Sequence, residues 1–169
     1  MKTPHDLPDP LASLLPADLL PLCRPQRLAR AQPLFATVAR PLQLFWVTKG
    51  EVALERPGRE GQTLVLQRCR QGFVAEASLQ SARYHCDARA LVDSRLVAVP
   101  LAPLRAALAQ DAAFANRWVA LLNAELRRAR LQCERLALPR VQDRLLHLID
   151  TEGAQMIQAA KKAVAEIKV

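Results

Sequence analysis

The sequence predicts a mainly β domain with α-helices before and after it. Between Pro41 and Pro100, short runs rich in Val, Leu and aromatic residues are separated by glycine-containing turns, spaced roughly every 8–12 residues. From Asp111 to Leu138 the chain has no glycine and is rich in Ala, Leu, Arg and Glu, which is typical of helix. We therefore expect a sandwich or barrel followed by a long helix.

The length and the charge limit the classes of protein that fit. The chain has 169 residues, enough for one domain and a short appendage, and its formal net charge of +8 by itself identifies no partner. The four cysteines form no C-x-x-C pair, and no apolar run has the length of a signal peptide or a membrane span. We expect a cytoplasmic protein with reduced thiols and no membrane association.

Catalytic motifs are missing from the sequence. It contains no G-x-S-x-G, no P-loop and no G-x-G-x-x-G, and its three histidines do not combine with Ser and Asp into a nucleophilic arrangement. The sequence predicts that the protein is not an enzyme.

Residues 1–40 are predicted to form a helical lead-in. Prolines recur every few residues, at Pro16, Pro21, Pro25 and Pro33, and each one limits the extension of a helix. Short helical turns that pack on the main domain follow from this pattern. Residues 41–110 then form the β domain, where four of the five glycines of the chain lie.

The long helix is predicted over residues 111–138, with Asp111 near its N-cap and Pro139 ending it. Apolar or small residues recur at alternating intervals of three and four, which defines a coiled-coil seam. The members of this seam used for prediction are Val119, Leu122, Leu126, Ala129, Cys133 and Leu136. A second stripe of Phe114, Trp118 and Leu121 lies on a neighbouring face. We expect the stripe to dock on the β domain and the seam to form a homodimer, with burial of both within one monomer as the alternative.

Residues 139–169 are predicted to form short helices, the first of them capped by Gly153. The last stretch has helical composition, an apolar pattern that includes Met156, Val164 and Ile167, and no motif.

Several features of the β segment occur in a defined order. A Lys49-Gly50 turn follows an aromatic strand, a hairpin lies at Gly61, and Gly72 precedes a segment that opens with Glu76. In this order the features resemble the Crp/Fnr superfamily of bacterial transcription regulators. The resemblance implies a double-stranded β-helix, the jelly roll of cyclic-nucleotide-binding domains, flanked by N-terminal short helices and a long C-terminal dimerisation helix.

The resemblance also implies a ligand pocket. Its candidate residues are Ala75, Glu76, Arg83, Tyr84 and His85. Relatives that bind cyclic nucleotides use Gly-Glu for the ribose and Arg-Ser for the phosphate, but here Ala75 replaces the Gly, and Tyr84 and His85 match the Arg-Ser pair. Because the guanidinium–phosphate bond is lost unless Arg83 takes that place, we do not expect tight cAMP binding, and the effector stays unknown.

Residues 84–90 allow two interpretations, a half-buried strand or a haem site. Alternation puts Tyr84, Cys86, Ala88 and Ala90 on one face of a strand and the polar residues His85, Asp87 and Arg89 on the other. We expect a half-buried strand with Cys86 in the core and a solvated, mutually paired polar face. The alternative, implied by haem-sensing relatives, is that His85 or Cys86 is an axial haem ligand; no other metal site is expected.

The function expected from the resemblance is effector sensing by a dimeric domain of a transcription regulator. Ligand in the β-roll would be coupled to DNA through a winged helix-turn-helix, of which no complete copy is recognisable after Gly153. The alternative is a stand-alone dimeric ligand- or haem-binding sensor module with no DNA function.

Overall fold

A computed structural model describes residues 7–167, and the chain divides into two compact units, Met1–Arg117 and Trp118–Val169. The first unit contains a β-roll with short helices, and the second contains a pair of long helices. In chain order the elements up to the end of the roll are α1 (Asp9–Leu14), η2 (Leu20–Leu22), β1 (Arg24–Leu28), β2 (Pro33–Phe35), β3 (Gln43–Lys49), β4 (Val52–Pro57), β5 (Thr63–Cys69), β6 (Gly72–Val74), η3 (Glu76–Ser78), β7 (Asp87–Ala90), β8 (Ser94–Pro100) and α2 (Leu101–Gln110).

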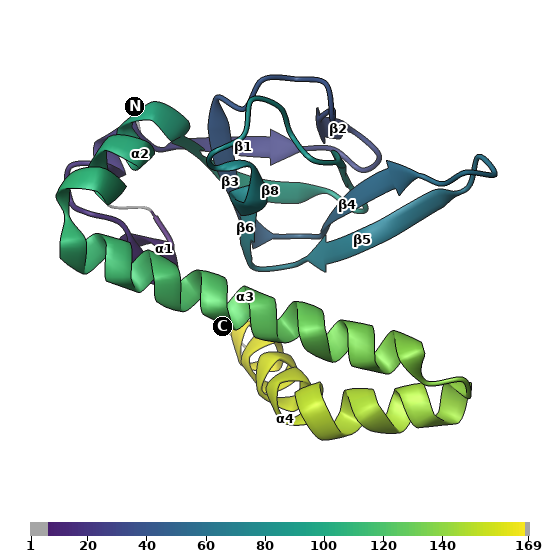
Figure 1. The fold of residues 1–169 in the computed structure, drawn as a ribbon. Helices are drawn as coiled ribbons and strands as arrows, with labels where there is room; N and C mark the ends of the chain where they lie inside the picture. Colours follow the sequence, from purple (N-terminus) through teal and green to yellow (C-terminus); the bar gives the residue numbers. More distant parts are fainter. Residues whose placement is uncertain (1–6, 168–169) are drawn as a thin grey trace. The chain divides into compact units, whose positions relative to one another are not determined.

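The eight strands form two four-stranded antiparallel sheets (Figure 1). One sheet has the order β1-β8-β3-β6 and the other the order β2-β7-β4-β5. Apart from the β4–β5 hairpin, successive strands thus cross from one sheet to the other, which is the connectivity of a jelly roll. This confirms the predicted fold class, a mainly β roll flanked by short N-terminal helices and a long C-terminal helix.

The central strands β3 and β8 build much of the core. Leu44 pairs with Val99 and Trp46 with Val97, and all four side chains are buried. Because both faces of these strands are apolar, their residues form continuous apolar runs in the sequence. The turn after β3 needs Gly50, which has φ +97°, because a Cβ there would lie 2.7 Å from the Asp93 carbonyl oxygen.

The prediction that residues 1–40 are only helical was wrong for residues 24–35. These residues form β1 and β2, each at the edge of a sheet. β1 pairs only with β8, and Pro33 opens β2, which pairs only with β7. At an edge a proline is tolerated because one side of the strand makes no ladder hydrogen bonds, so prolines that argued against helix did not argue against these strands.

The long helix α3 (Ala112–Ala137) begins in the first unit and continues into the second. The Phe114 amide donates to Asp111 Oδ1 at 2.9 Å, which confirms the predicted N-cap. Phe114 is fully buried and Arg117 Nε donates to the Leu14 carbonyl oxygen at 3.2 Å. The first turns of α3 are therefore fixed within the roll unit.

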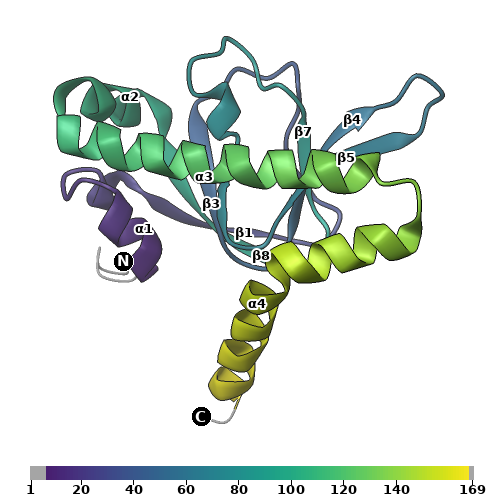
Figure 2. The same cartoon turned by 60° about the horizontal axis from the view of Figure 1, so that its bottom comes forward.

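The predicted short helices of residues 139–169 are instead one helix, α4 (Val141–Ile167), and Gly153 lies inside it rather than at its C-cap. A glycine in a helix interior costs about 1 kcal/mol relative to alanine, which flanking helix formers can outweigh. An ion pair between Arg135 and Glu152 joins α4 to α3 beside this glycine. Figure 2 shows α4 changing direction along its length.

Further features of α4 concern its ends. Arg144 Nε donates to the Leu138 carbonyl oxygen at 2.6 Å and so closes the connection from α3. The side chains of Met156 and Val164, which belong to the predicted apolar pattern of the last stretch, lie outside the described residues.

Within residues 7–167, no helix is long and apolar enough to span a membrane.

Replacing Phe114 with alanine should lower the free energy of unfolding of the chain by about 3–5 kcal/mol, because it removes a fully buried aromatic ring and leaves a cavity. Chemical denaturation followed by circular dichroism measures this loss. Leu42→Ala is the matched control, since Leu42 is 66% exposed, and it should change stability by less than about 0.5 kcal/mol. Equal losses in the two variants would contradict the role given to Phe114.

Candidate functional site

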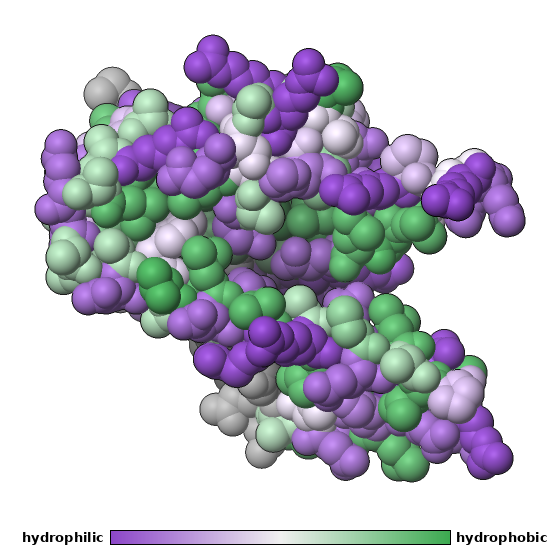
Figure 3. Space-filling view, viewed as in Figure 1, coloured by the Kyte–Doolittle hydropathy of each residue, from purple (hydrophilic) through white to green (hydrophobic). Residues whose placement is uncertain are grey.

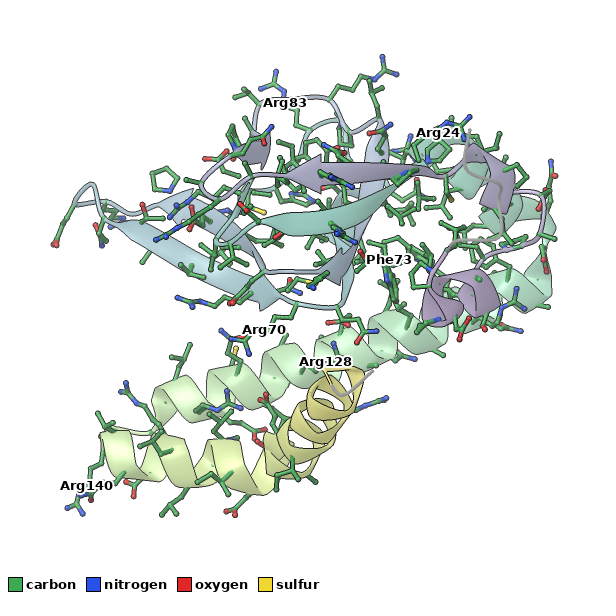
Figure 4. All side chains as sticks on the ribbon, turned by 180° about the vertical axis from the view of Figure 1, so that it is seen from behind. Arg24, Arg70, Phe73, Arg83, Arg128 and Arg140 are labelled. Atoms are coloured by element: carbon green, nitrogen blue, oxygen red, sulfur yellow. The ribbon has the colours of Figure 1, made fainter. Side chains whose placement is uncertain are left out.

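The segment between β6 and β7 carries the predicted ligand residues. β6 is held against β3, where Phe73 packs edge-on against Trp46 with ring centroids 5.0 Å apart (Figure 4). The chain then turns through Ala75, which has φ +76° and ψ 10° and is buried. A left-handed conformation is unfavourable for a residue with a Cβ, so this turn is strained at the position where relatives carry glycine.

Glu76 begins the short helix η3 directly after this turn. Its side chain is half-buried, and its Oε2 atom is fully buried. The Glu76 carboxylate is also close enough to the Cys86 thiol to raise the pKa of that thiol. Ala75 and Glu76 therefore lie together at the start of the segment, as the resemblance implied.

Tyr84 points into the roll rather than toward solvent. Its ring stacks on Phe35 with centroids 3.9 Å apart, and its hydroxyl donates to the Gln43 carbonyl oxygen at 3.0 Å. Burial raises the pKa of this phenol, an effect that the backbone hydrogen bonds partly offset. Tyr84 thus contributes its hydroxyl and its ring to the core at the position matched to the phosphate-binding arginine.

Arg83 and His85 flank Tyr84 on the exposed side. Arg83 is exposed and lies at the outer edge of the roll (Figure 4). His85 Nε2 lies 2.9 Å from Ser81 Oγ and 3.0 Å from the Ala77 carbonyl oxygen. Because a carbonyl oxygen only accepts, the hydrogen bond to Ala77 requires the tautomer that is protonated at Nε2. The structure does not bring Arg83 and His85 to the same face as Tyr84.

The predicted alternation of buried and exposed side chains over residues 84–90 is confirmed. Tyr84, Cys86, Ala88 and Ala90 are buried, whereas His85 and Arg89 are exposed and Asp87 is intermediate. Burial also raises the pKa of the Cys86 thiol, with Arg56 lowering it by a smaller amount. Cys86 is therefore a protonated core thiol, as the simpler interpretation predicted.

The predicted mutual pairing of the polar face was wrong. Arg89 Nε donates to Glu55 Oε2 at 2.6 Å, and Asp87 Oδ1 accepts from the Thr37 amide at 2.7 Å and from Thr37 Oγ1 at 2.8 Å. In an antiparallel sheet a strand's closest polar neighbours lie on the adjacent strand or loop, not along the same strand. The Thr37 hydrogen bonds hold the pKa of Asp87 below its usual value.

The predictions from sequence did not include two residues of this site. Thr37 and Arg56 join His85 and Asp87 around a hollow of about 520 Å³. Arg56 Nε donates to the His85 carbonyl oxygen at 2.8 Å. Both residues are distant in sequence, by 50 positions for the Thr37–Asp87 bond and 29 for the Arg56–His85 bond, and no local motif marks them.

The described residues do not assemble a metal site. Within residues 7–167, no group of three or more His, Cys, Asp or Glu side chains is placed to hold a metal ion. For haem, Cys86 would have to lose its proton in a buried position, and ligation through His85 Nε2 would have to replace its contacts with Ser81 and Ala77. Cys86 therefore does not fit an axial ligand in this conformation.

A family model described as the cyclic nucleotide-binding domain matches residues 25–111, which cover the strands β2 to β8, almost all of β1, and the helix α2. The chain belongs to the cyclic nucleotide-binding domain family. Among curated proteins, none matches this chain by sequence. Members of this family and the regulators that carry it are generally not enzymes.

Solved structures of regulators share the fold. The catabolite activator protein of Thermus thermophilus is similar with a TM-score of 0.58 and 25% identity, over 80% of this chain and 63% of that one. The c-di-GMP responsive regulator CLP of Xanthomonas campestris has a TM-score of 0.62 and 22% identity, over 77% and 68%. The sensor domain of the regulator DNR of Pseudomonas aeruginosa has a TM-score of 0.59 and 20% identity, over 78% and 89%.

The chain therefore shares the cyclic nucleotide-binding domain with these regulators. It spans about 63% of the length of the Thermus protein, the first of these relatives.

Replacing Asp87 with asparagine should destabilise the cyclic nucleotide-binding-type domain in a pH-dependent way. Because the folded-state pKa of Asp87 lies below the unfolded value, its stabilisation is present above about pH 4 and is lost as the pH falls through the folded-state pKa. Removing the charge should cost about 1–2 kcal/mol at about pH 7 and close to nothing near pH 2.

Urea unfolding at several pH values measures this difference. Asp93→Asn is the control for loss of one carboxylate that accepts a backbone hydrogen bond at the surface, from the Arg30 amide. A loss in Asp87→Asn that stays constant across the pH range would contradict the assigned charge-assisted bonds.

Proposed function

We propose that this chain is the effector-sensing and dimerising part of a Crp/Fnr-type transcription regulator, which couples a ligand of the β-roll to DNA binding. The observation that carries the proposal is the long helix α3, which begins inside the sensor unit and continues as an uncovered apolar seam. A sensor that only bound its ligand would need neither feature.

The seam is exposed over its whole length. Exposed fractions are 52% for Val119, 36% for Leu122, 49% for Leu126 and 62% for Leu136, and Ala129 and Cys133 are exposed as well. The second stripe behaves differently, because Phe114 and Trp118 are buried. This exposure favours the expected homodimer over the alternative considered from sequence, the burial of both stripes within one monomer.

The helix α4 adds apolar surface to the same unit. Val141, Leu145 and Ile149 follow each other at intervals of four and are 68%, 54% and 62% exposed. Figure 3 shows apolar side chains among charged ones on the surface of this unit. Exposed apolar surface of this extent supports association with a second copy, as the a/d spacing of α3 specifies.

Phe114 could transmit a change in the β-roll on ligand binding to the seam of α3. It is fully buried in the sensor unit and lies on the same helix as Val119 and Leu122. A change in the packing of the roll around Phe114 would shift the helix that carries the dimer contacts, and a DNA-reading module attached to a dimer responds to such a shift.

The effector we propose meets no guanidinium at the position matched to the phosphate-binding arginine of the relatives. Tyr84 occupies the matched position with its hydroxyl committed to Gln43, and Arg83 is exposed. Ala75, Glu76 and His85 stay candidates for ligand contact, with Thr37 and Arg56 added by the structure.

Replacing Leu126 with glutamate should convert a dimer into a folded monomer, because the substitution places a charge in the seam at a position that is 49% exposed in the single chain. Analytical ultracentrifugation and native mass spectrometry measure the change. Asn123→Glu, on an exposed position outside the seam, is the matched control and should leave the dimer intact. A wild-type chain that is monomeric at micromolar concentration would contradict the proposal.

Cys133 provides an independent test of how the two α3 helices would align in the proposed dimer. It is the exposed cysteine of the four and belongs to the seam, whereas Cys23, Cys69 and Cys86 are buried. In a parallel in-register dimer, mild oxidation should link two copies through Cys133, and both Cys133→Ser and Leu126→Glu should abolish the linked species.

The DNA part of the proposal is tested by fusing the chain to the winged helix-turn-helix of a catabolite activator-type regulator. Because dimerisation makes the second half-site contact intramolecular, the fusion should bind a two-half-site operator about 10²–10⁴-fold more tightly than its Leu126→Glu variant in a gel shift. Equal binding by both fusions would contradict the proposal and favour a stand-alone sensor module.

A further inference from the structure

A second hollow, of about 560 Å³, lies on the sensor unit. Its walls are residues 40–42 of the β2–β3 connection, residues 80–82 after η3, and residues 101, 102 and 105 of α2. None of the residues predicted to contact the effector is among them. The hollow is next to the effector segment but is a separate site.

Hydrogen bonds between its walls preform the hollow. The Leu101 amide donates to the Leu42 carbonyl oxygen at 2.9 Å, which joins α2 to the β2–β3 connection. Arg105 Nε donates to the Leu79 carbonyl oxygen at 2.6 Å, which joins α2 to the loop after η3. A site whose walls are tied together in this way loses little conformational entropy when a ligand enters.

The charge of the hollow is entirely positive. Arg40 and Arg105 line it, and no carboxylate does. Within the part of the chain that the structure describes, neither guanidinium takes part in an ion pair. The single bond to Leu79 fixes the Arg105 side chain through Nε and leaves its two terminal amino groups for another acceptor.

Further donors and an apolar wall complete the site. The Ser81 side chain also lines the hollow, and a serine hydroxyl can donate to an anionic ligand. Gln80 adds a side-chain amide, and Leu42, 66% exposed, gives an apolar wall.

We propose that this hollow binds a phosphate monoester with a small apolar group. A phosphate monoester has three terminal oxygens and nearly two negative charges at neutral pH, so it matches two arginines on different elements better than a carboxylate, which has two oxygens and one charge. The apolar group of the ester would lie on Leu42. The site does not depend on the effector proposed above, since the two share no predicted contact residue.

Phenyl phosphate is the probe, with benzoate as a carboxylate of similar apolar body. Calorimetry at constant ionic strength should show saturable binding of phenyl phosphate by the full chain and at least about tenfold weaker binding of benzoate. Arg40→Ala, an exposed position, should weaken phenyl phosphate binding about tenfold or more.

A second variant tests the site without removing an arginine. Ala102 is exposed in the first turn of α2, where an aspartate is favourable for the helix, so Ala102→Asp should fold and should abolish binding by placing a carboxylate in the hollow. Arg59→Ala, an exposed arginine outside the hollow, should bind as the wild type does, and so should Glu76→Gln. No saturable binding by the wild type, or equal binding by the wild type, Arg40→Ala and Ala102→Asp, would overturn the proposal.

Discussion

The packing of Tyr84 in the roll is the constraint on which the candidate effector site depends. Its ring stacks on Phe35 of β2 and its hydroxyl is bonded to Gln43 of β3, so one side chain ties the loop before β7 to both sheets. Once Tyr84 points inward, alternation sends His85 outward and Cys86 inward. By the family resemblance this is the position of the phosphate-binding arginine in cyclic-nucleotide relatives, and we therefore propose that this chain does not bind a cyclic nucleotide in their way.

The coupling of sensor to dimer depends on a different feature, the continuity of α3. Phe114 is buried in the sensor unit, and the seam residues that follow on the same helix are exposed. A helix with one end buried and the other uncovered transmits a displacement only if something binds the uncovered part. We propose a second copy of the chain as this partner, because the a/d spacing of α3 is typical of a coiled coil and a second copy would also cover part of the exposed apolar surface of α4.

Much of the fold could be predicted from local sequence signals. Glycine turns marked the strands β3 to β6, Asp111 marked the start of α3, and alternation over residues 84–90 gave the correct buried face. Signals from prolines were ambiguous at β1 and β2, because edge strands tolerate them, and Gly153 did not end α4. The polar contacts of the site could not be predicted, since Thr37 and Arg56 approach Asp87 and His85 only because β2, β7 and β4, which are distant in sequence, are neighbours in one sheet.

The central claim is that this domain keeps the turn and the Glu76 of its family but lacks the arginine that binds the phosphate in cyclic-nucleotide relatives. Calorimetric titration of the intact chain with cAMP, and separately with cGMP, tests it most directly. We predict no saturable heat at ligand concentrations up to about 1 mM, since the charge-assisted bonds of a phosphate-binding guanidinium are missing. Saturable binding at micromolar concentration that is lost in Arg83→Ala would contradict the claim, because it would show that Arg83 reaches the pocket and replaces the missing arginine.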